Sequence, residues 1–200
     1  MLIVRGRSCV RRRRCLRARG PAYRGGTLKI AIILYGPKGS GKSRIAQMLA
    51  QRLGVHHVDP DTLVLELLAH GLEPDPVDGW LTEVHRHVLT AFERHDVVSV
   101  EATGAWDSDW RLADDLQRDG AAVVCTWVPA SLEETLRRLR ARDQKRVEIG
   151  EQEVRRIFTA ANERAAAHPF ELRIDTDAGA DDTEIAVTVA AAIAQKRRTR

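Results

Sequence analysis

Residues 28–35 read LKIAIILY, and residues 36–43, which follow directly, read GPKGSGKS. The first stretch is an almost continuous apolar run, which is typical of a strand buried on both faces of a parallel sheet. The second matches Gly-x-x-x-x-Gly-Lys-Ser, and a helix is expected from Lys42 to about Leu53, where Gly54 ends it. A strand that leads through glycines into a helix is the context in which this pattern forms a phosphate-binding loop.

The glycine-rich segment has, at each position, a residue that a phosphate-binding loop requires. Gly36, Gly39 and Gly41 allow unusual backbone angles and let the amides approach an anion without an intervening Cβ atom. Those amides and the dipole of the following helix attract phosphate groups. Lys42 can reach the β- and γ-phosphates of a nucleotide, and the Ser43 hydroxyl can coordinate Mg²⁺. The alternative is a glycine-rich turn that binds nothing, although strand, glycines, lysine and hydroxyl all occur together.

The first 26 residues differ from the rest of the chain in charge. They contain nine of the 32 basic residues, all arginines, and none of the 28 acidic residues, which leaves residues 27–200 with a formal charge of −5. We expect residues 1–26 to be a disordered arginine-rich leader and residues 27–200 to be one domain. The leader could be inert, a loose arm for polyanions or a targeting segment. The acidic domain argues against a nucleic-acid channel within it.

Cysteine content and hydropathy argue against two further classes of protein. Three cysteines, two of them in the leader, provide neither a disulfide framework nor a Cys-x-x-Cys metal site. No window of 18 consecutive apolar residues occurs, which argues against a membrane span. We therefore expect a cytoplasmic protein, monomeric or homodimeric, that does not bind a membrane.

The rest of the chain alternates short apolar runs with longer periodic stretches, which indicates repeated strand–helix units and a largely parallel sheet. The predicted strands are residues 28–35, 55–58, 97–100, 121–128 and 170–174. The predicted helices are residues 42–53, 62–70, 80–94, 109–118, 132–142, 151–167 and 182–196. The expected fold class is therefore α/β, with a five-stranded parallel sheet between two layers of helices.

Acidic residues follow two of the predicted strands, and ligands of a doubly wound sheet collect at the carboxyl ends of its strands. Asp59 and Asp61, separated by a proline, could hold a magnesium-bound water with one carboxylate and accept a proton from a substrate hydroxyl with the other. The alternative for Asp61 is a helix N-cap. Glu101 follows the third strand, where it could lie near the metal ion or cap the next helix. Thr103 could line the substrate side through its hydroxyl.

Arginines follow the fourth strand, where a lid could close over the phosphates. Residues 137–146 read Arg-Arg-Leu-Arg-Ala-Arg-Asp-Gln-Lys-Arg. Guanidinium groups in a lid neutralise the charge that develops in the transition state of phosphoryl transfer. Arg138 and Arg142, four residues apart on one helix face, are the best candidate pair. The alternative is a helix that displays its arginines to water.

With these motifs the chain resembles the small P-loop kinase superfamily, which includes the shikimate kinase, gluconate kinase, adenylate kinase, chloramphenicol phosphotransferase, zeta-toxin-like and AAA-type ATP-binding kinase-like groups. The resemblance covers about residues 28–194, and its firm part is the Walker A segment at residues 36–43. It implies a three-layer αβα P-loop NTP hydrolase fold. It also implies that Asp59 helps to place Mg²⁺ and that Asp61 contacts the acceptor hydroxyl. Where shikimate kinases have a Gly-Gly-Gly turn, residues 101–104 read Glu-Ala-Thr-Gly, which looks more like the kinase-like proteins whose acceptors vary.

The residues and the resemblance together predict that residues 27–200 are a P-loop kinase-like domain: an ATP-dependent phosphotransferase that uses Mg²⁺ and acts on a hydroxyl of a small metabolite or nucleoside. One alternative is an ATPase or nucleotide switch without such an acceptor, and another is a nucleic-acid-end kinase. Residues 126–129 show no guanine-recognition motif, which argues against a switch that binds GTP. The predicted nucleotide-binding residues are Gly36, Pro37, Lys38, Gly39, Ser40, Gly41, Lys42 and Ser43. The predicted metal-binding residues are Ser43, Asp59 and Glu101. The predicted catalytic residues are Lys42, Asp59, Asp61, Arg138 and Arg142.

Overall fold

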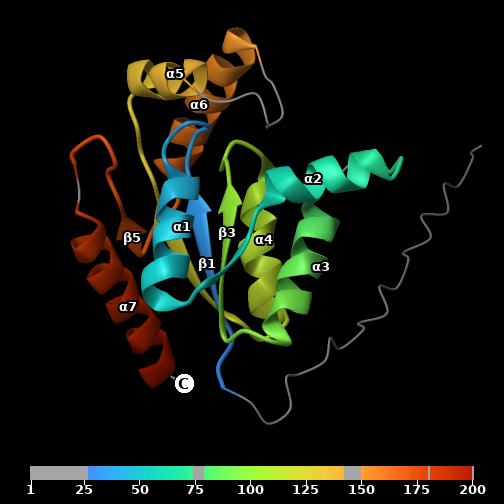
Figure 1. Ribbon diagram of the computed structural model, residues 1–200, viewed down its shortest axis with the longest axis vertical. Coiled ribbons are helices and arrows are strands. Elements are labelled where there is room, and N and C mark those ends of the chain that lie inside the picture. Colours follow the sequence, from blue (N-terminus) through green and yellow to red (C-terminus); the bar gives the residue numbers. More distant parts are fainter. Residues whose placement is uncertain (1–26, 74–78, 142–149, 180, 200) are drawn as a thin grey trace, which may run out of the picture.

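The structure is a computed structural model that describes residues 27–73, 79–141, 150–179 and 181–199, so the arginine-rich leader lies outside the described residues. Five parallel strands form one sheet in the order β2-β3-β1-β4-β5, with helices on both faces (Figure 1). The strands are β1 (Ile30–Tyr35), β2 (His56–Val58), β3 (Val97–Ala102), β4 (Ala122–Trp127) and β5 (Leu172–Arg173). The helices are α1 (Lys42–Leu53), α2 (Pro60–Ala69), α3 (Leu81–Phe92), α4 (Asp107–Arg118), α5 (Leu132–Arg140), α6 (Glu151–Ala165) and α7 (Asp182–Arg198). Over the described ranges, none of these helices is long and apolar enough to cross a membrane.

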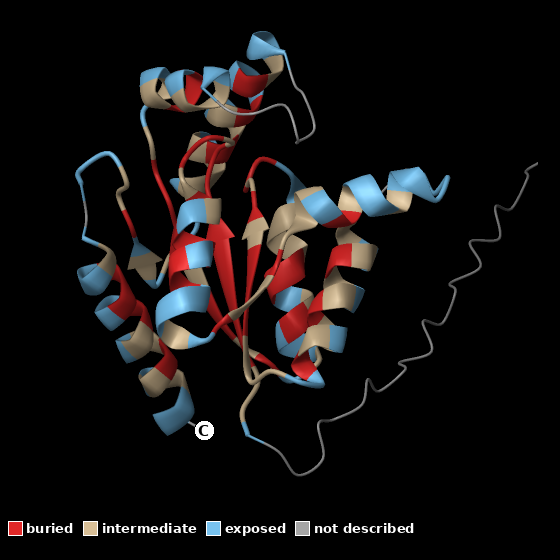
Figure 2. Cartoon of the chain, viewed as in Figure 1, coloured by how far each residue is buried: buried red, intermediate tan, exposed pale blue. Residues whose placement is uncertain are grey.

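This arrangement is the three-layer α/β fold that the sequence predicts, and its central strand explains the apolar run. β1 is buried along its whole length. Its residues Ala31 and Ile33 belong to a core with α3, α4 and α6, whereas Ile30 and Ile32 belong to a second core with α1 and α7. Figure 2 shows the buried strands between helices whose outer faces are exposed. A strand that is covered on both faces requires apolar residues at consecutive positions.

The central position of β1 brings the ends of three strands together. In the strand register Tyr35 lies beside Ala102 of β3 and Trp127 of β4, and Val58 of β2 lies beside Val100 of β3. The residues that follow β1, β2 and β3 therefore meet at one edge of the sheet, and α5 and α6 lie above this edge in Figure 1. This edge is where a ligand is expected in a doubly wound sheet.

Two element boundaries differ from the predicted ones in a way that matters for the site. β3 extends through Ala102, so Glu101 lies within the strand and not after it. α2 begins at Pro60 and not at Thr62, because proline is well suited to the first position of a helix and Asp59 caps it. Glu101 therefore lies within β3 and Asp61 within α2, where regular backbone fixes their positions more firmly than a loop would.

Candidate functional site

Residues 36–43 comprise the loop between β1 and α1 together with the first two residues of α1. We refer to this segment as the loop, and two glycines determine its shape. Gly39 and Gly41 have φ angles of 88° and 97°, in the left-handed region that favours glycine. A Cβ atom at Gly39 would lie 2.8 Å from the carbonyl oxygen of Thr135, so the loop packs too closely against α5 for a side chain. The amides of Gly39 and Gly41 donate to no backbone carbonyl of the described residues. This geometry leaves them available to an anion.

The ammonium group of Lys42 lies under the start of this loop. The Lys42 side chain is buried, and its Nζ donates to the carbonyl oxygens of Gly36 at 2.7 Å and of Pro37 at 3.0 Å. Lysine is seldom buried unless polar groups compensate its charge, and here the two carbonyls do so. Ser40 is also fully buried, and its Oγ has no hydrogen-bond partner among the described residues. The loop therefore holds a positive charge at its base.

A pocket of about 150 Å³ lies between the loop and the ends of β2 and β3. On the loop side it is lined by Lys38, Gly39, Gly41, Lys42 and Ser43. The other lining residues are Asp59, Pro60, Asp61, Glu101, Ala102, Thr103 and Asp109. We call the four acids among them, Asp59, Asp61, Glu101 and Asp109, the carboxylate wall. The structure thus brings most of the predicted site residues to one cavity, while Gly36, Pro37 and Ser40 are not among the residues that line it.

Asp59 and Asp61 have different roles at the start of α2. The Asp59 carboxylate caps the helix, because Oδ1 accepts from the Asp61 amide and Oδ2 accepts from the Thr62 hydroxyl, each at 3.0 Å. The capping role considered for Asp61 in the sequence therefore belongs to Asp59. Oδ1 of Asp61 lies 3.5 Å from Nζ of Lys38. This contact joins the loop to the carboxylate wall.

Glu101 is a mostly buried carboxylate on β3, with a side chain that is 13% exposed. Its Oε1 lies 3.4 Å from Nε2 of His57. Burial raises the pKa of Glu101, but the nearby His57 ring, the charge of Lys42 and a hydrogen bond from Ser43 together outweigh burial and lower the pKa to about 2. Glu101 is therefore an anion at neutral pH, beside the lysine and the serine of the loop.

The oxygen atoms around the pocket suit Mg²⁺. Ser43, Asp59 and Glu101 come from α1, the β2–α2 junction and β3, and all three line the cavity. Within the described ranges no group of three His, Cys, Asp or Glu residues could hold a metal ion by itself. Mg²⁺ does not require such a group, because proteins usually bind it through one or two carboxylates, waters and substrate phosphates. Oε1 of Glu101 is buried and makes no well-formed hydrogen bond to the described residues, so this carboxylate has capacity for a further partner.

Asp109, in the first turn of α4, completes the carboxylate wall and is held by Thr103. Thr103 Oγ1 donates to Oδ2 of Asp109 at 2.6 Å, and the amide of Trp106 donates to the same oxygen at 3.5 Å. Asp109 therefore caps α4, and the capping role considered for Glu101 is wrong. Burial raises the pKa of Asp109, although hydrogen bonds from Thr103 and nearby backbone amides act in the opposite direction. Sequence reasoning placed Asp109 at a helix start and missed its position in the pocket, which only the fold creates.

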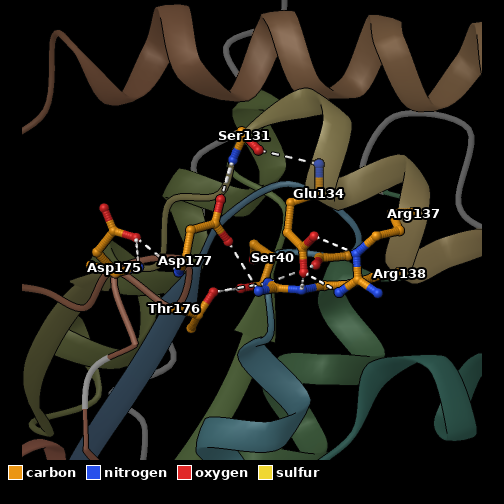
Figure 3. Close-up of polar contacts among 10 residues, drawn as sticks. Ser40, Ser131, Glu134, Arg137, Arg138, Asp175, Thr176 and Asp177 are labelled. Atoms are coloured by element: carbon orange, nitrogen blue, oxygen red, sulfur yellow. Dashed lines mark hydrogen bonds and ion pairs between the residues drawn. The ribbon is translucent and has the colours of Figure 1, made fainter.

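Arg138 does not line the pocket. Its guanidinium group donates to the carbonyl of Gly39 at 3.4 Å, to Oγ1 of Thr176 at 2.9 Å and to Oδ1 of Asp177 at 3.0 Å. Glu134, on the same helix, accepts a further hydrogen bond from it at 2.6 Å. Figure 3 shows Arg138 between Glu134 and the Thr176–Asp177 segment. In this structure Arg138 therefore fastens α5 and the segment after β5 to the loop backbone.

The other lid arginines divide into exposed and undescribed residues. Arg137 and Arg140 have side chains that are 67% and 69% exposed, as expected for a helix that displays its arginines to water. Arg142 lies outside the described residues. Thr176 donates to the carbonyl of Ser40 at 2.7 Å, so the network around Arg138 contacts the loop at two points. α5 thus supports the loop, although none of the lid arginines that the structure describes lines the pocket.

Comparisons with known proteins agree with this geometry. A protein-family model described as an AAA domain matches residues 32–166. The chain is 30% identical over 153 residues to shikimate kinase from Geobacter metallireducens, covering 72% of this chain and 82% of that protein. It is also 30% identical over 135 residues to cytidylate kinase from Haloquadratum walsbyi. This match covers 62% of this chain and 64% of the cytidylate kinase, so it spans less than two thirds of that relative's length.

A solved structure provides a further relative. The tunicamycin resistance protein from Deinococcus radiodurans aligns with a TM-score of 0.57 and 25% identity, over 82% of this chain and 95% of that chain. The family match spans more than half of the chain and includes the loop, the carboxylate wall and α5. The chain therefore belongs to the AAA-domain family of the small P-loop kinase superfamily.

Proposed function

We propose that the protein is an ATP-dependent phosphotransferase that transfers the γ-phosphate of ATP to a hydroxyl of a small molecule. The observation that carries this proposal is the presence of the phosphate-binding loop and the carboxylate wall in one pocket. The loop by itself would account only for nucleotide binding. The wall adds groups that can orient a hydroxyl and accept its proton. The relatives named shikimate kinase and cytidylate kinase support a phosphotransferase.

On the loop side, the chain's own residues would bind and neutralise the phosphates. The loop amides would donate to phosphate oxygens, and Nζ of Lys42 can exchange a carbonyl contact for an oxygen of the γ-phosphate. Ser43, Asp59 and Glu101 would hold Mg²⁺, which when bound offsets the negative charge of the phosphates. Arg138 would act by keeping α5 against the loop, since its guanidinium contacts the Gly39 carbonyl.

On the wall side, Asp61 is the best candidate for the general base. Asp59 already accepts two hydrogen bonds as the cap of α2, which restricts its carboxylate. Asp61 approaches the loop instead, through its contact with Lys38. A bound γ-phosphate would attract Lys38, and Asp61 could then accept the proton of the acceptor hydroxyl as the phosphate is transferred. The acceptor oxygen forms a bond to the γ-phosphorus while the bond from that phosphorus to the β–γ bridging oxygen of ATP breaks, so the proton moves to the carboxylate and ADP leaves.

The charge of the pocket favours an acceptor without an acid group. The carboxylate wall provides four acids, and the two lysines that line the pocket, Lys38 and Lys42, both belong to the loop. No arginine of the described residues lines the pocket to bind a carboxylate of the acceptor. A nucleoside or another uncharged or cationic hydroxyl compound fits this wall better than an acid does. The relative named a tunicamycin resistance protein makes antibiotics a class to include among the acceptors tested.

A mass-spectrometric screen tests the proposal. The full chain is incubated with ATP, Mg²⁺ and a pool of nucleosides, sugars, amino sugars, hydroxy acids and antibiotics, and products heavier by one phosphate group are sought. We expect at least one uncharged or cationic compound to gain a phosphate, and Asp61→Asn to abolish this gain while nucleotide binding persists. If ATP is hydrolysed at a rate that no compound changes, and no compound gains a phosphate, the protein is an ATPase and the proposal is wrong.

A further inference from the structure

His57 connects the edge of the sheet to Glu101. In the strand register His57 of β2 lies beside Ser99 of β3, and its Nδ1 is 3.0 Å from Ser99 Oγ. Its Nε2 lies 3.4 Å from Oε1 of Glu101. Val58 and Val100 belong to the core with α3 and α4. Because side chains alternate along a strand, His57, Ser99 and Glu101 face the opposite layer of helices. This layer contains α1, which begins at the end of the phosphate-binding loop.

The two ring nitrogens of His57 have different partners, and these partners favour one position for the ring proton. Ser99 is fully buried, and Nδ1 lies 3.0 Å from its hydroxyl, which can donate to Nδ1, and 3.3 Å from its carbonyl oxygen, which can only accept. Because the Glu101 carboxylate 3.4 Å from Nε2 can only accept, it favours the neutral ring that carries its proton on Nε2, and in that ring Nδ1 accepts from the hydroxyl. Nε2 and Oε1 are both buried, and neither has a well-formed hydrogen bond to any other described residue. A small movement of the ring or of the carboxylate would therefore satisfy both atoms at once.

We infer that His57 is a positioning residue that holds the Glu101 carboxylate beside Ser43 and thereby prepares the magnesium site. This inference rests on the proposed function, because it assigns Mg²⁺ to Glu101 and Ser43. A group that hydrogen-bonds a metal ligand without contacting the metal itself fixes the orientation of that ligand, and its loss commonly lowers metal affinity by about 10–100-fold. Without His57, the carboxylate would be free to turn toward the nearby charge of Lys42, away from the metal position.

The preceding histidine provides a matched control. His56 lies on the same strand but faces the other layer, where its ring stacks on His95 with centroids 4.2 Å apart and planes 8° apart. His56→Ala therefore removes the same type of side chain from the same short strand without removing a contact to Glu101. Any general effect of altering β2 should appear in this variant as well.

Calorimetric titration of the full chain with the non-hydrolysable analogue AMP-PNP, in EDTA and over a series of Mg²⁺ concentrations, tests the inference. His57→Phe keeps a ring of similar size but removes both nitrogens. Mg²⁺ should raise the affinity for AMP-PNP, and we expect His57→Phe to need about ten times more Mg²⁺ for half of this gain. Its affinity for AMP-PNP in EDTA should stay unchanged. His57→Gln, whose amide can donate to Glu101, should recover most of the loss, and His56→Ala should match the wild type.

Three results would overturn the inference without affecting the proposed function. The first is an equal Mg²⁺ requirement in His57→Phe and the wild type, and the second is a loss of affinity that is equally large in EDTA. If His57→Phe does not fold, Ser99→Ala is the substitute variant, because it keeps the ring but removes the hydroxyl that orients it. The third contradicting result is an unchanged Mg²⁺ requirement in Ser99→Ala. A wild-type chain that binds no AMP-PNP at any Mg²⁺ concentration overturns the proposed function itself, and the inference with it.

Discussion

The phosphate-binding loop and the carboxylate wall line the same pocket but are built in different ways. The loop is one continuous stretch, residues 36–43, and its shape comes from backbone angles and close backbone packing. The wall is assembled from the β2–α2 junction, β3 and the first turn of α4, and side-chain hydrogen bonds such as that between Thr103 and Asp109 fix it. The proposed phosphate site is therefore specified locally in the sequence, whereas the proposed acceptor side exists only in the folded chain.

The largest effect should come from removing the positive charge at the base of the loop. Lys42→Ala deletes the ammonium group that can reach the γ-phosphate, and we expect phosphotransfer to fall by about 10³-fold or more. Initial rates with an acceptor found in the screen would measure this loss, with thermal melting as a check on folding. Lys38→Ala is the matched control, because Lys38 belongs to the same loop but contacts Asp61. Equal losses in both variants would contradict a special role for the position of Lys42.

On the wall, Asp61→Asn should lower turnover by about 10²–10⁴-fold, since an amide keeps the shape of the side chain but cannot accept the proton. The affinity for AMP-PNP should stay the same, because the loop is untouched. Steady-state kinetics and calorimetry on the same preparation separate the two effects. Normal turnover in Asp61→Asn would show that the base is another group. Together with Lys42→Ala, this variant tests whether the two sides of the pocket have separable functions.

A smaller effect should appear in the stability of the loop. Gly39→Ala forces a side chain into a left-handed backbone conformation and against the Thr135 carbonyl, 2.8 Å from the new Cβ atom. Gly54→Ala is the control, because Gly54 also has a positive φ, 65°, but no atom within 4 Å of the added Cβ. We expect Gly39→Ala to lower the free energy of unfolding by about 1–3 kcal/mol more than Gly54→Ala, as measured in urea. Equal losses would mean that the loop relaxes easily and is not held by packing against α5.

The smallest effect should be on the pH dependence of the free energy of unfolding, to which two carboxylates of the wall contribute in opposite directions. The pKa of Glu101 is lowered to about 2 from an ordinary value of 4.5, so its charge stabilises the fold above pH 4.5 and this contribution is lost as the pH falls toward 2. The pKa of Asp109 is raised, so protonation on acidification relieves the penalty for burying its charge. Glu101→Gln should therefore make the free energy of unfolding less sensitive to acid, and Asp109→Asn should make it more sensitive. Urea unfolding from neutral pH down to about pH 3 measures both slopes, and slopes that change in the same direction would contradict these pKa shifts.

The sequence predicts the fold and much of the pocket because the required features are local. The apolar run of β1, the glycine-rich loop and the start of α1 are consecutive in the chain. Acidic residues at the ends of β2 and β3 could be placed near the loop, because strands of a parallel sheet end at the same edge. Asp59, Asp61 and Glu101 do line one cavity with the loop in the folded chain.

The remaining residues depend on contacts between distant segments, which no local pattern records. Asp109 reaches the pocket only because α4 begins next to Thr103, and His57 faces Glu101 only in the register that pairs β2 with β3. Arg138 was expected over the phosphates, but Asp177, which is 39 residues away in the sequence, holds it elsewhere. Hydrogen bonds between elements therefore decide which polar side chains enter the pocket.

The backbone amides of Gly39 and Gly41 can test directly the claim that residues 36–43 surround the terminal phosphates of a nucleotide. Their ¹H and ¹⁵N chemical shifts should move on titration with ATP and Mg²⁺, and should move far less with AMP, which lacks the β- and γ-phosphates. If ATP and Mg²⁺ leave both amides unchanged, or if AMP shifts them equally, the loop is not the phosphate site and the claim is contradicted.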